Sequence, residues 1–420
     1  MATLVSIRNF REGPVGRLDE PPDRATLDAS RAWTARVAAL EAGLMRAACG
    51  WLARLAPYPV KLELGQHASE DADHCEWLVR RLAGIGGPRA DEVVRTAPAW
   101  FRDLDGAPSP LAWLLGTYRV VKPGLAALAA EGGLLGRYVP SDEALWCQKP
   151  LPRPVMPAEY PVNWPDEEPR FDAPPPPADE AERVRRNLHG RIYGELDALE
   201  LFARNVYEFP QAPWAYQAGM VKIVWDEARH TDALMHTYLL KGGRMDAWPT
   251  SRGGYVNIYR GRDPLERAIL YHRIGEARGM DSIYQDVRVY RDLEEPEIAL
   301  HRDYELADEV NHVRFGVRWA WRFTDFDQAA LDEAIVAMAE RGIPGAQTWV
   351  GLRSGEQKSP EGCGLVQPPP EHGCPVCVRG KKLAEFSDQE IDAWVEFAGG
   401  RTHEDAGELA GLGLAHLARG

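Results

Sequence analysis

The chain has 420 residues, of which 45% are hydrophobic, and it carries a formal net charge of −14. This length fits two compact domains with tails, and the hydrophobic content argues against wholesale disorder. The acidic balance disfavours nucleic acid and anionic membrane surfaces as partners. The first 20 residues lack the apolar stretch of a signal peptide, and no run of about 18 apolar residues occurs. We therefore expect a cytoplasmic protein.

The N-terminal third is predicted to be helical. Apolar residues recur at helical spacing over 27–56 and 61–84, and further helical stretches follow near 89–103 and 109–131. The proline-dense stretch that follows cannot sustain a helix. We interpret residues 1–148 as an N-terminal helical domain and residues 149–178 as a linker.

Four long helical patterns come next, over 179–208, 212–240, 263–294 and 295–323. A short loop joins the first helix to the second, another joins the third to the fourth, and a long connection joins the second to the third. Two antiparallel pairs with one long crossover are typical of ferritin-like bundles. The sequence therefore predicts an all-α fold with a four-helix bundle over 179–324.

The C-terminal extension, residues 325–420, is predicted to contain helices over 328–341 and near 387–398. Between them lies a Gly/Pro-rich stretch with three cysteines and one histidine. These residues are Cys363, His372, Cys374 and Cys377. Their spacing fits a structural zinc site. A redox pair of cysteines and simple free thiols are the alternatives.

The motif that carries chemistry occurs twice. The second long helix contains Asp226-Glu-Ala-Arg-His230, and the fourth contains Asp308-Glu-Val-Asn-His312. Residues three apart share a helix face, so the glutamate and histidine of each motif can meet one metal ion. A carboxylate with an imidazole is a ligand mixture suited to iron or manganese.

Two metal ions need further carboxylates, and the other two helices each offer one. Glu195 lies 32 residues before Glu227, and Glu276 lies 33 residues before Glu309. Glu200 competes with Glu195 but points about 140° away around the helix, so both cannot face the centre. The predicted ligands of the two metal ions are Glu195, Glu227, His230, Glu276, Glu309 and His312.

Residues around these ligands are expected to support them. Metal-bound histidines usually donate their second N–H to a carboxylate, and Asp226 and Asp308 are the natural acceptors. Arg229 is expected to pair with one of these aspartates. Among the tyrosines that could lie near the metals, Tyr304, five residues before Glu309, is the candidate we favour as a radical site or as a residue that supports the ligands.

A weaker copy of the motif lies in the N-terminal region. Asp71 and His74 have the same three-residue spacing, and Glu41 lies 30 residues before Asp71. No second matching pair accompanies them. We therefore favour a vestigial or structural role for these three residues.

With these motifs in place, residues 179–323 resemble the ferritin-like diiron-carboxylate superfamily. The string Asp-Glu-Ala-Arg-His resembles the second-helix motif of bacterial multicomponent monooxygenase hydroxylases. The segments HGRIYGELDALELFARN and GEARGMD resemble an uncharacterised group of ferritin-like proteins. The resemblance implies a diiron site that activates dioxygen or oxidises ferrous iron, and it gives the six residues above the role of ligands.

The function expected from the resemblance is that of a non-haem diiron oxygenase or oxidase. Its metals would be Fe/Fe or Mn/Fe, and it would use dioxygen and an unknown electron donor to oxidise a small organic substrate by hydroxylation, desaturation or N-oxygenation. The alternative is iron handling, as a ferroxidase or a storage protein. A homodimer and one structural zinc ion are further expectations.

Overall fold

The computed structural model describes residues 24–53, 58–96, 177–245, 247–248, 258–354 and 375–403, and these residues are mostly helical. Apart from an isolated bridge between Val376 and Thr402, the described residues contain no β structure. The predicted all-α fold class is therefore confirmed. No described helix combines the length and hydrophobicity that a membrane span requires.

The N-terminal helices form a hairpin of α2 (Arg24–Leu52) and α3 (Tyr58–Gly84), followed by the short α4 (Ala90–Val94). The first two agree with the predicted helices within a few residues. The helix predicted over 89–103 ends early, since Arg95 already follows α4. The helix predicted over 109–131 and most of the predicted linker lie outside the described residues.

The next hairpin contains α9 (Glu180–Glu208) and α10 (Trp214–Leu240), as predicted. The carboxylate of Asp179 caps α9 by accepting a hydrogen bond from the backbone N–H of Glu182. Gly242 follows α10 with a φ of 76°, a conformation that other residues rarely adopt. The chain can therefore turn sharply there.

The third long helix differs from the prediction in its interior. It begins at the predicted cap, Asp263, with α12 (Pro264–Arg267), and it ends with α13 (Ala277–Asp292). Between them lies η2 (Ala268–Glu276), a π-helical segment of nine residues. A π-helix adds residues to each turn and so changes which side chains share a face; such segments are frequent at functional sites.

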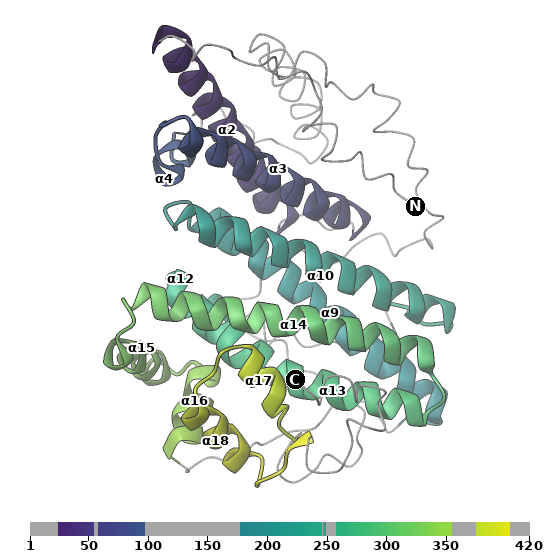
Figure 1. Ribbon diagram of the computed structural model, residues 1–420. Coiled ribbons are helices and arrows are strands. Elements are labelled where there is room, and N and C mark those ends of the chain that lie inside the picture. The colour runs from purple at the N-terminus through teal and green to yellow at the C-terminus, as the bar shows by residue number, and fades with distance from the viewer. Residues whose placement is uncertain are drawn as a thin grey trace.

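The fourth long helix, α14 (Pro296–Phe323), lies between α10 on one side and η2 with α13 on the other (Figure 1). Helix α9 packs against α10, so the four helices form two adjacent hairpins. Gly316 allows α14 to approach η2 closely, because a methyl group at this position would overlap Cβ of His272. These contacts bring the predicted metal ligands into one interior.

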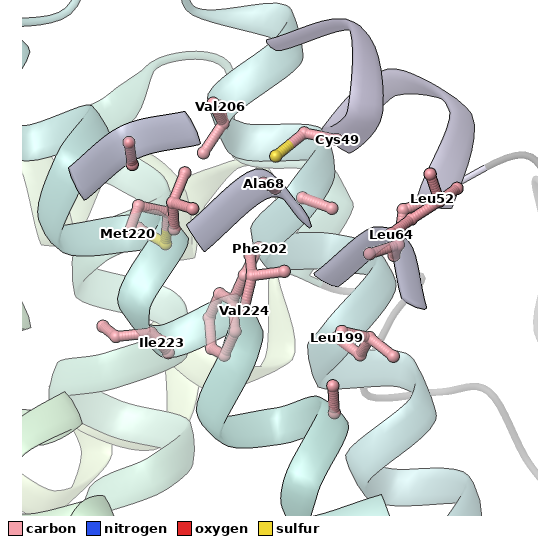
Figure 2. Packing of buried hydrophobic residues seen from close by; sticks show 14 of the residues in the cluster. Cys49, Leu52, Leu64, Ala68, Leu199, Phe202, Val206, Met220, Ile223 and Val224 are labelled. Atoms are coloured by element: carbon pink, nitrogen blue, oxygen red, sulfur yellow. The ribbon is translucent and has the colours of Figure 1, made fainter. Parts of the chain in front are cut away.

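Two hydrophobic cores flank that interior. In the first, α2 and α3 pack on α9 and α10, with Cys49, Ala68, Phe202 and Val224 among the buried side chains (Figure 2). The second joins η2 and α14 to the C-terminal helices α15 (Gln328–Glu340), α16 (Pro344–Ser354) and α18 (Asp388–Phe397). The N-terminal hairpin thus shares a continuous core with α9 and α10. The predicted domain boundaries stay predictions.

Two helices of the C-terminal region were not predicted, α16 and the short α17 (Val378–Leu383). Lys381 of α17 is fully buried and forms an ion pair with Asp281 of α13, with Nζ 2.9 Å from Oδ2. Its Nζ also donates a hydrogen bond to the carbonyl oxygen of Ala277. This lysine therefore fixes the C-terminal segment to α13, the helix that begins directly after Glu276.

A second buried ion pair fixes the N-terminal hairpin to α9. Nζ of Lys61 lies 2.7 Å from Oε1 of Glu200, and both side chains are 1% exposed. Glu200 is therefore neither a metal ligand nor a surface residue. The preference for Glu195 over Glu200 as the inward-facing glutamate agrees with this placement.

Replacing one partner of this pair should destabilise the fold strongly. We expect Lys61→Met to lower the free energy of unfolding by about 3–5 kcal/mol, because Glu200 would stay buried and lose its ion pair with Lys61. The double variant Lys61→Met/Glu200→Met should recover most of the loss, since it removes both charges. Urea denaturation followed by circular dichroism measures this. A double variant no more stable than the single one would contradict the account.

Candidate metal centre

Two groups of acidic residues and histidines lie side by side between the four long helices. In each group, one ligand atom from each of four residues lies within 4.8 Å of the others. We call the first the Glu305 position; it consists of Glu195, His230, Glu305 and Glu309. We call the second the Glu276 position; it consists of Glu227, Glu276, Glu309 and His312. Glu309 belongs to both, so its carboxylate joins the two positions.

The imidazoles face the carboxylates through Nδ1. In the Glu305 position, Nδ1 of His230 lies 3.8 Å from Oε2 of Glu195 and 3.9 Å from Oε1 of Glu309. In the Glu276 position, Nδ1 of His312 lies 3.5 Å from Oε1 of Glu276 and 3.7 Å from Oε1 of Glu309. Atoms about 2.1 Å from one ion in an octahedral shell lie about 3 Å from their neighbours and about 4.2 Å from the atom opposite. These separations fit a shared ion.

Glu227 lies between the two imidazoles. Its Oε2 is 3.4 Å from Nδ1 of His230, and its Oε1 is 3.2 Å from Nδ1 of His312. The sequence motif pairs Glu227 with His230 alone. The structure instead makes Glu227, like Glu309, a carboxylate that faces both positions.

The hydrogen bonding of these atoms tests whether they suit a metal. Both carboxylate oxygens of Glu227 and the Nδ1 atoms of His230 and His312 are buried without a hydrogen-bond partner. One carboxylate oxygen of Glu276 and one of Glu305 are also buried without a hydrogen-bond partner. Buried polar atoms without partners are unfavourable and rare in folded proteins. Two cations, one in each group, would satisfy these atoms, so the residues fit a dinuclear metal centre.

The electrostatics of the centre favour positive charge. Burial raises the pKa of Glu309 well above its usual value, and the charges of neighbouring glutamates add to this effect. Burial lowers the pKa of His230, but the surrounding carboxylates, Asp308 first, outweigh it and hold that pKa well above the usual value. Burial also lowers the pKa of His312, and the neighbouring carboxylates, Asp226 first, outweigh burial and hold that pKa well above the usual value. A negative potential of this kind attracts cations.

The two aspartates of the motifs hold the histidines from outside. Nε2 of His230 lies 3.2 Å from Oδ2 of Asp308, and Nε2 of His312 lies 3.2 Å from Oδ2 of Asp226. Each histidine is thus oriented by the aspartate of the facing helix, one of the two arrangements considered from the sequence. Arg229 contacts both aspartates, with Nη2 3.2 Å from Oδ2 of Asp308. Arg229 therefore connects α10 to α14 through the two aspartates that orient the histidines.

The π-helical segment positions Glu276. Nδ1 of His272 lies 2.5 Å from Oε2 of Glu276, and the imidazole of His272 is stacked on Phe202 at 4.7 Å between ring centroids. His272 is completely buried. It orients one oxygen of Glu276 and leaves the other, Oε1, facing His312.

The structure places one predicted residue elsewhere. Tyr304 is 69% exposed and faces solvent, so it does not lie beside the metal positions. Its spacing from Glu309 puts it on the opposite side of α14. Tyr271 of the π-helical segment packs edge-on against Phe202, with 4.4 Å between ring centroids. Burial and then the charges of four of the glutamates, Glu227 first, raise the pKa of its hydroxyl well above the usual value.

Two residues of the centre were missed by the sequence analysis, Glu305 and Arg302. Glu305 lies four residues before Glu309 on the same face of α14 and is 1% exposed. Arg302 is equally buried and forms an ion pair with Glu305. The four-residue spacing is the signal that identifies Glu305, whereas a buried arginine has no pattern of its own.

The remaining candidates fall outside this centre. Cys363, His372 and Cys374 lie outside the described residues; Cys377 is buried and directly precedes α17. The zinc site stays a prediction. Glu41, Asp71 and His74 lie within reach of one another on α2 and α3, with Nδ1 of His74 3.7 Å from Oε2 of Glu41.

A comparison with known proteins finds a match to one family model over part of the chain and indicates no activity. Residues 147–337 match a family described as "Protein of unknown function (DUF455)". The matched segment is less than half of the chain, but it contains every residue of the two metal positions. No curated protein and no solved structure matches the chain.

The aspartates should matter to metal affinity although they do not reach the metal positions. We expect Asp226→Asn and Asp308→Asn each to weaken metal binding by about 10- to 100-fold, because the histidine loses its orienting carboxylate. Asp303→Asn, on the same helix as Asp308 but outside both groups, is the matched control. Competition with a chelating dye measures the affinity for Mn(II). Equal losses in the control and the two variants would contradict this role.

Proposed function

We propose that α9, α10, η2 with α13, and α14 form a ferritin-like four-helix bundle that holds two iron ions. We further propose that the protein is a non-haem diiron oxidoreductase that uses dioxygen to oxidise a small organic substrate. The observation that carries the proposal is the set of buried, unpartnered glutamate and histidine atoms converging between these helices. No other arrangement of the described residues gathers so many potential ligands.

The donor set supports iron or manganese over other metals. Five carboxylates and two imidazoles are hard or intermediate ligands, which suit these ions, and no thiolate takes part in either group. Four side chains at each position leave room in an octahedral shell for a small molecule. When bound, two ferrous ions supply electrons to dioxygen.

The chain's own residues have distinct tasks in this proposal. Glu309 belongs to both positions and Glu227 faces both imidazoles, so these two carboxylates would be shared by the two ions. Asp226 and Asp308 keep the imidazoles in one orientation, and Arg229 holds both aspartates in turn. The apolar residues around the glutamates, such as Phe202 and Val224, exclude water. A substrate oxidation also needs an external electron donor.

The test is the reaction of the iron-loaded protein with oxygen. Anaerobic loading with Fe(II) should give two iron ions per chain, and oxygen should then be consumed repeatedly when ascorbate is supplied as reductant. Glu309→Gln should bind less than two ions and lose at least 90% of the oxygen uptake, because it alters the ligand shared by both positions. Glu297→Gln, an exposed glutamate at the start of the same helix, is the control and should behave as the unmodified protein.

Two outcomes would contradict the proposed oxygenase. Growth of an iron mineral far beyond two ions per chain would instead support the ferroxidase or storage alternative. Two bound ions that do not react with oxygen would leave a metal centre without this chemistry. Oxygen uptake by an oxygen electrode and iron content by mass spectrometry distinguish these cases.

A further inference from the structure

A buried arginine lies against one of the two metal positions. Arg302 is 1% exposed, and its guanidinium lies against the Glu305 position. Nη1 forms an ion pair with Glu305 and lies 3.7 Å from Oε1 of Glu195, and Nη2 lies 3.5 Å from Oδ2 of Asp286. Two of its three acidic partners are therefore proposed ligands of the same metal ion.

The Glu276 position has no such competitor. Among the described residues, no lysine or arginine forms an ion pair with Glu227, Glu276 or Glu309. Glu276 is held by His272 through one oxygen only, and its other oxygen has no hydrogen-bond partner. The ligand atoms of this position are thus already free and oriented for a cation.

We infer that the two positions fill in a fixed order, and that Arg302 sets this order. The first divalent cation binds at the Glu276 position, and the second binds more weakly at the Glu305 position. A cation entering the Glu305 position must take Glu305 and Glu195 from the guanidinium and must remain close to its positive charge. An arginine side chain stays charged in proteins, so the guanidinium competes with the cation at any pH at which the glutamates are ionised. The inference rests on the proposed dinuclear centre.

Arg302 also balances the charge of the glutamates and the two cations in the filled centre. The five glutamates of the two positions carry five negative charges when ionised, and two divalent cations supply four positive ones. Arg302 supplies the fifth. The five glutamates, the two cations and Arg302 taken together therefore have no net charge, and Asp286 keeps the guanidinium in place. Asp286 is itself held by Arg191, with Nη2 2.8 Å from Oδ2.

The test is a titration of the metal-free full-length protein with Mn(II), followed by electron paramagnetic resonance and calorimetry. We expect two binding steps whose dissociation constants differ at least tenfold, the size typical of effects from residues around a metal site. The spectrum should change from that of an isolated Mn(II) ion to that of a coupled pair in the second step. Equal affinities would overturn the inference and leave the dinuclear centre standing.

Two ligand variants assign the steps. Glu276→Gln should weaken the tighter step by at least tenfold. Glu305→Gln should weaken only the second step, because it removes a ligand of the Glu305 position and leaves the charge of Arg302. Loss of the tighter step in Glu305→Gln would overturn the assigned order.

Two arginine variants test the cause. Arg302→Met removes the charge and should tighten the second step at least tenfold, which brings the two affinities closer together. Arg302→Lys keeps the charge and should retain the gap. An unchanged gap in Arg302→Met would overturn the role of the arginine. If Arg302→Met does not fold without metal, Arg302→Gln replaces it, because this variant also removes the charge but keeps hydrogen-bond donors for Glu305 and Asp286. No Mn(II) binding by the unmodified protein would contradict the proposed metal centre itself.

Discussion

Five glutamate side chains converge in an interior that is otherwise largely apolar, and the rest of the structure depends on how their charge is compensated. Carboxylates buried so close together repel one another and are unfavourable without counter-charges. Inside the centre, the compensation comes from two imidazoles whose pKa values are raised and from one buried arginine. The unpartnered oxygens that remain are those directed at the two metal positions.

The surrounding fold keeps these groups in place from several sides. Asp226, Asp308 and Arg229 connect the two motif helices, and His272 fixes Glu276 at the end of the π-helical segment. The N-terminal hairpin covers α9 and α10, and the C-terminal helices cover η2 and α14. Such support is what a preorganised centre needs, because ligands that repel one another would otherwise move apart.

Much of this arrangement could be predicted from the sequence because it follows helical periodicity. The helix ends are marked by Asp179, Asp263 and Gly242, and the two motifs repeat at nearly equal distances from an upstream glutamate. The pairing of each aspartate with the histidine of the facing helix was one of two arrangements that the motifs allowed. All six predicted ligands belong to the two groups of residues that could each hold a metal ion.

The rest depends on contacts between helices, which periodicity does not reveal. Tyr304 was expected near the metals from its distance along the chain, but it lies on the exposed side of α14. Arg302 resembles a surface residue in the sequence and is buried only because Glu305, Glu195 and Asp286 surround it. The π-helical segment has no simple sequence signal, although it decides where Glu276 points.

The central claim is that these glutamates and histidines hold two metal ions, and anomalous X-ray diffraction from crystals grown with Mn(II) or Fe(II) tests it most directly. The account predicts two anomalous peaks about 3.5–4 Å apart, as in other two-metal sites, with the carboxylate of Glu309 touching both. One peak should contact Glu276 and His312, and the other should contact Glu305 and His230. A single peak, no peak between α10 and α14, or ions bound only at Glu41, Asp71 and His74 would contradict it.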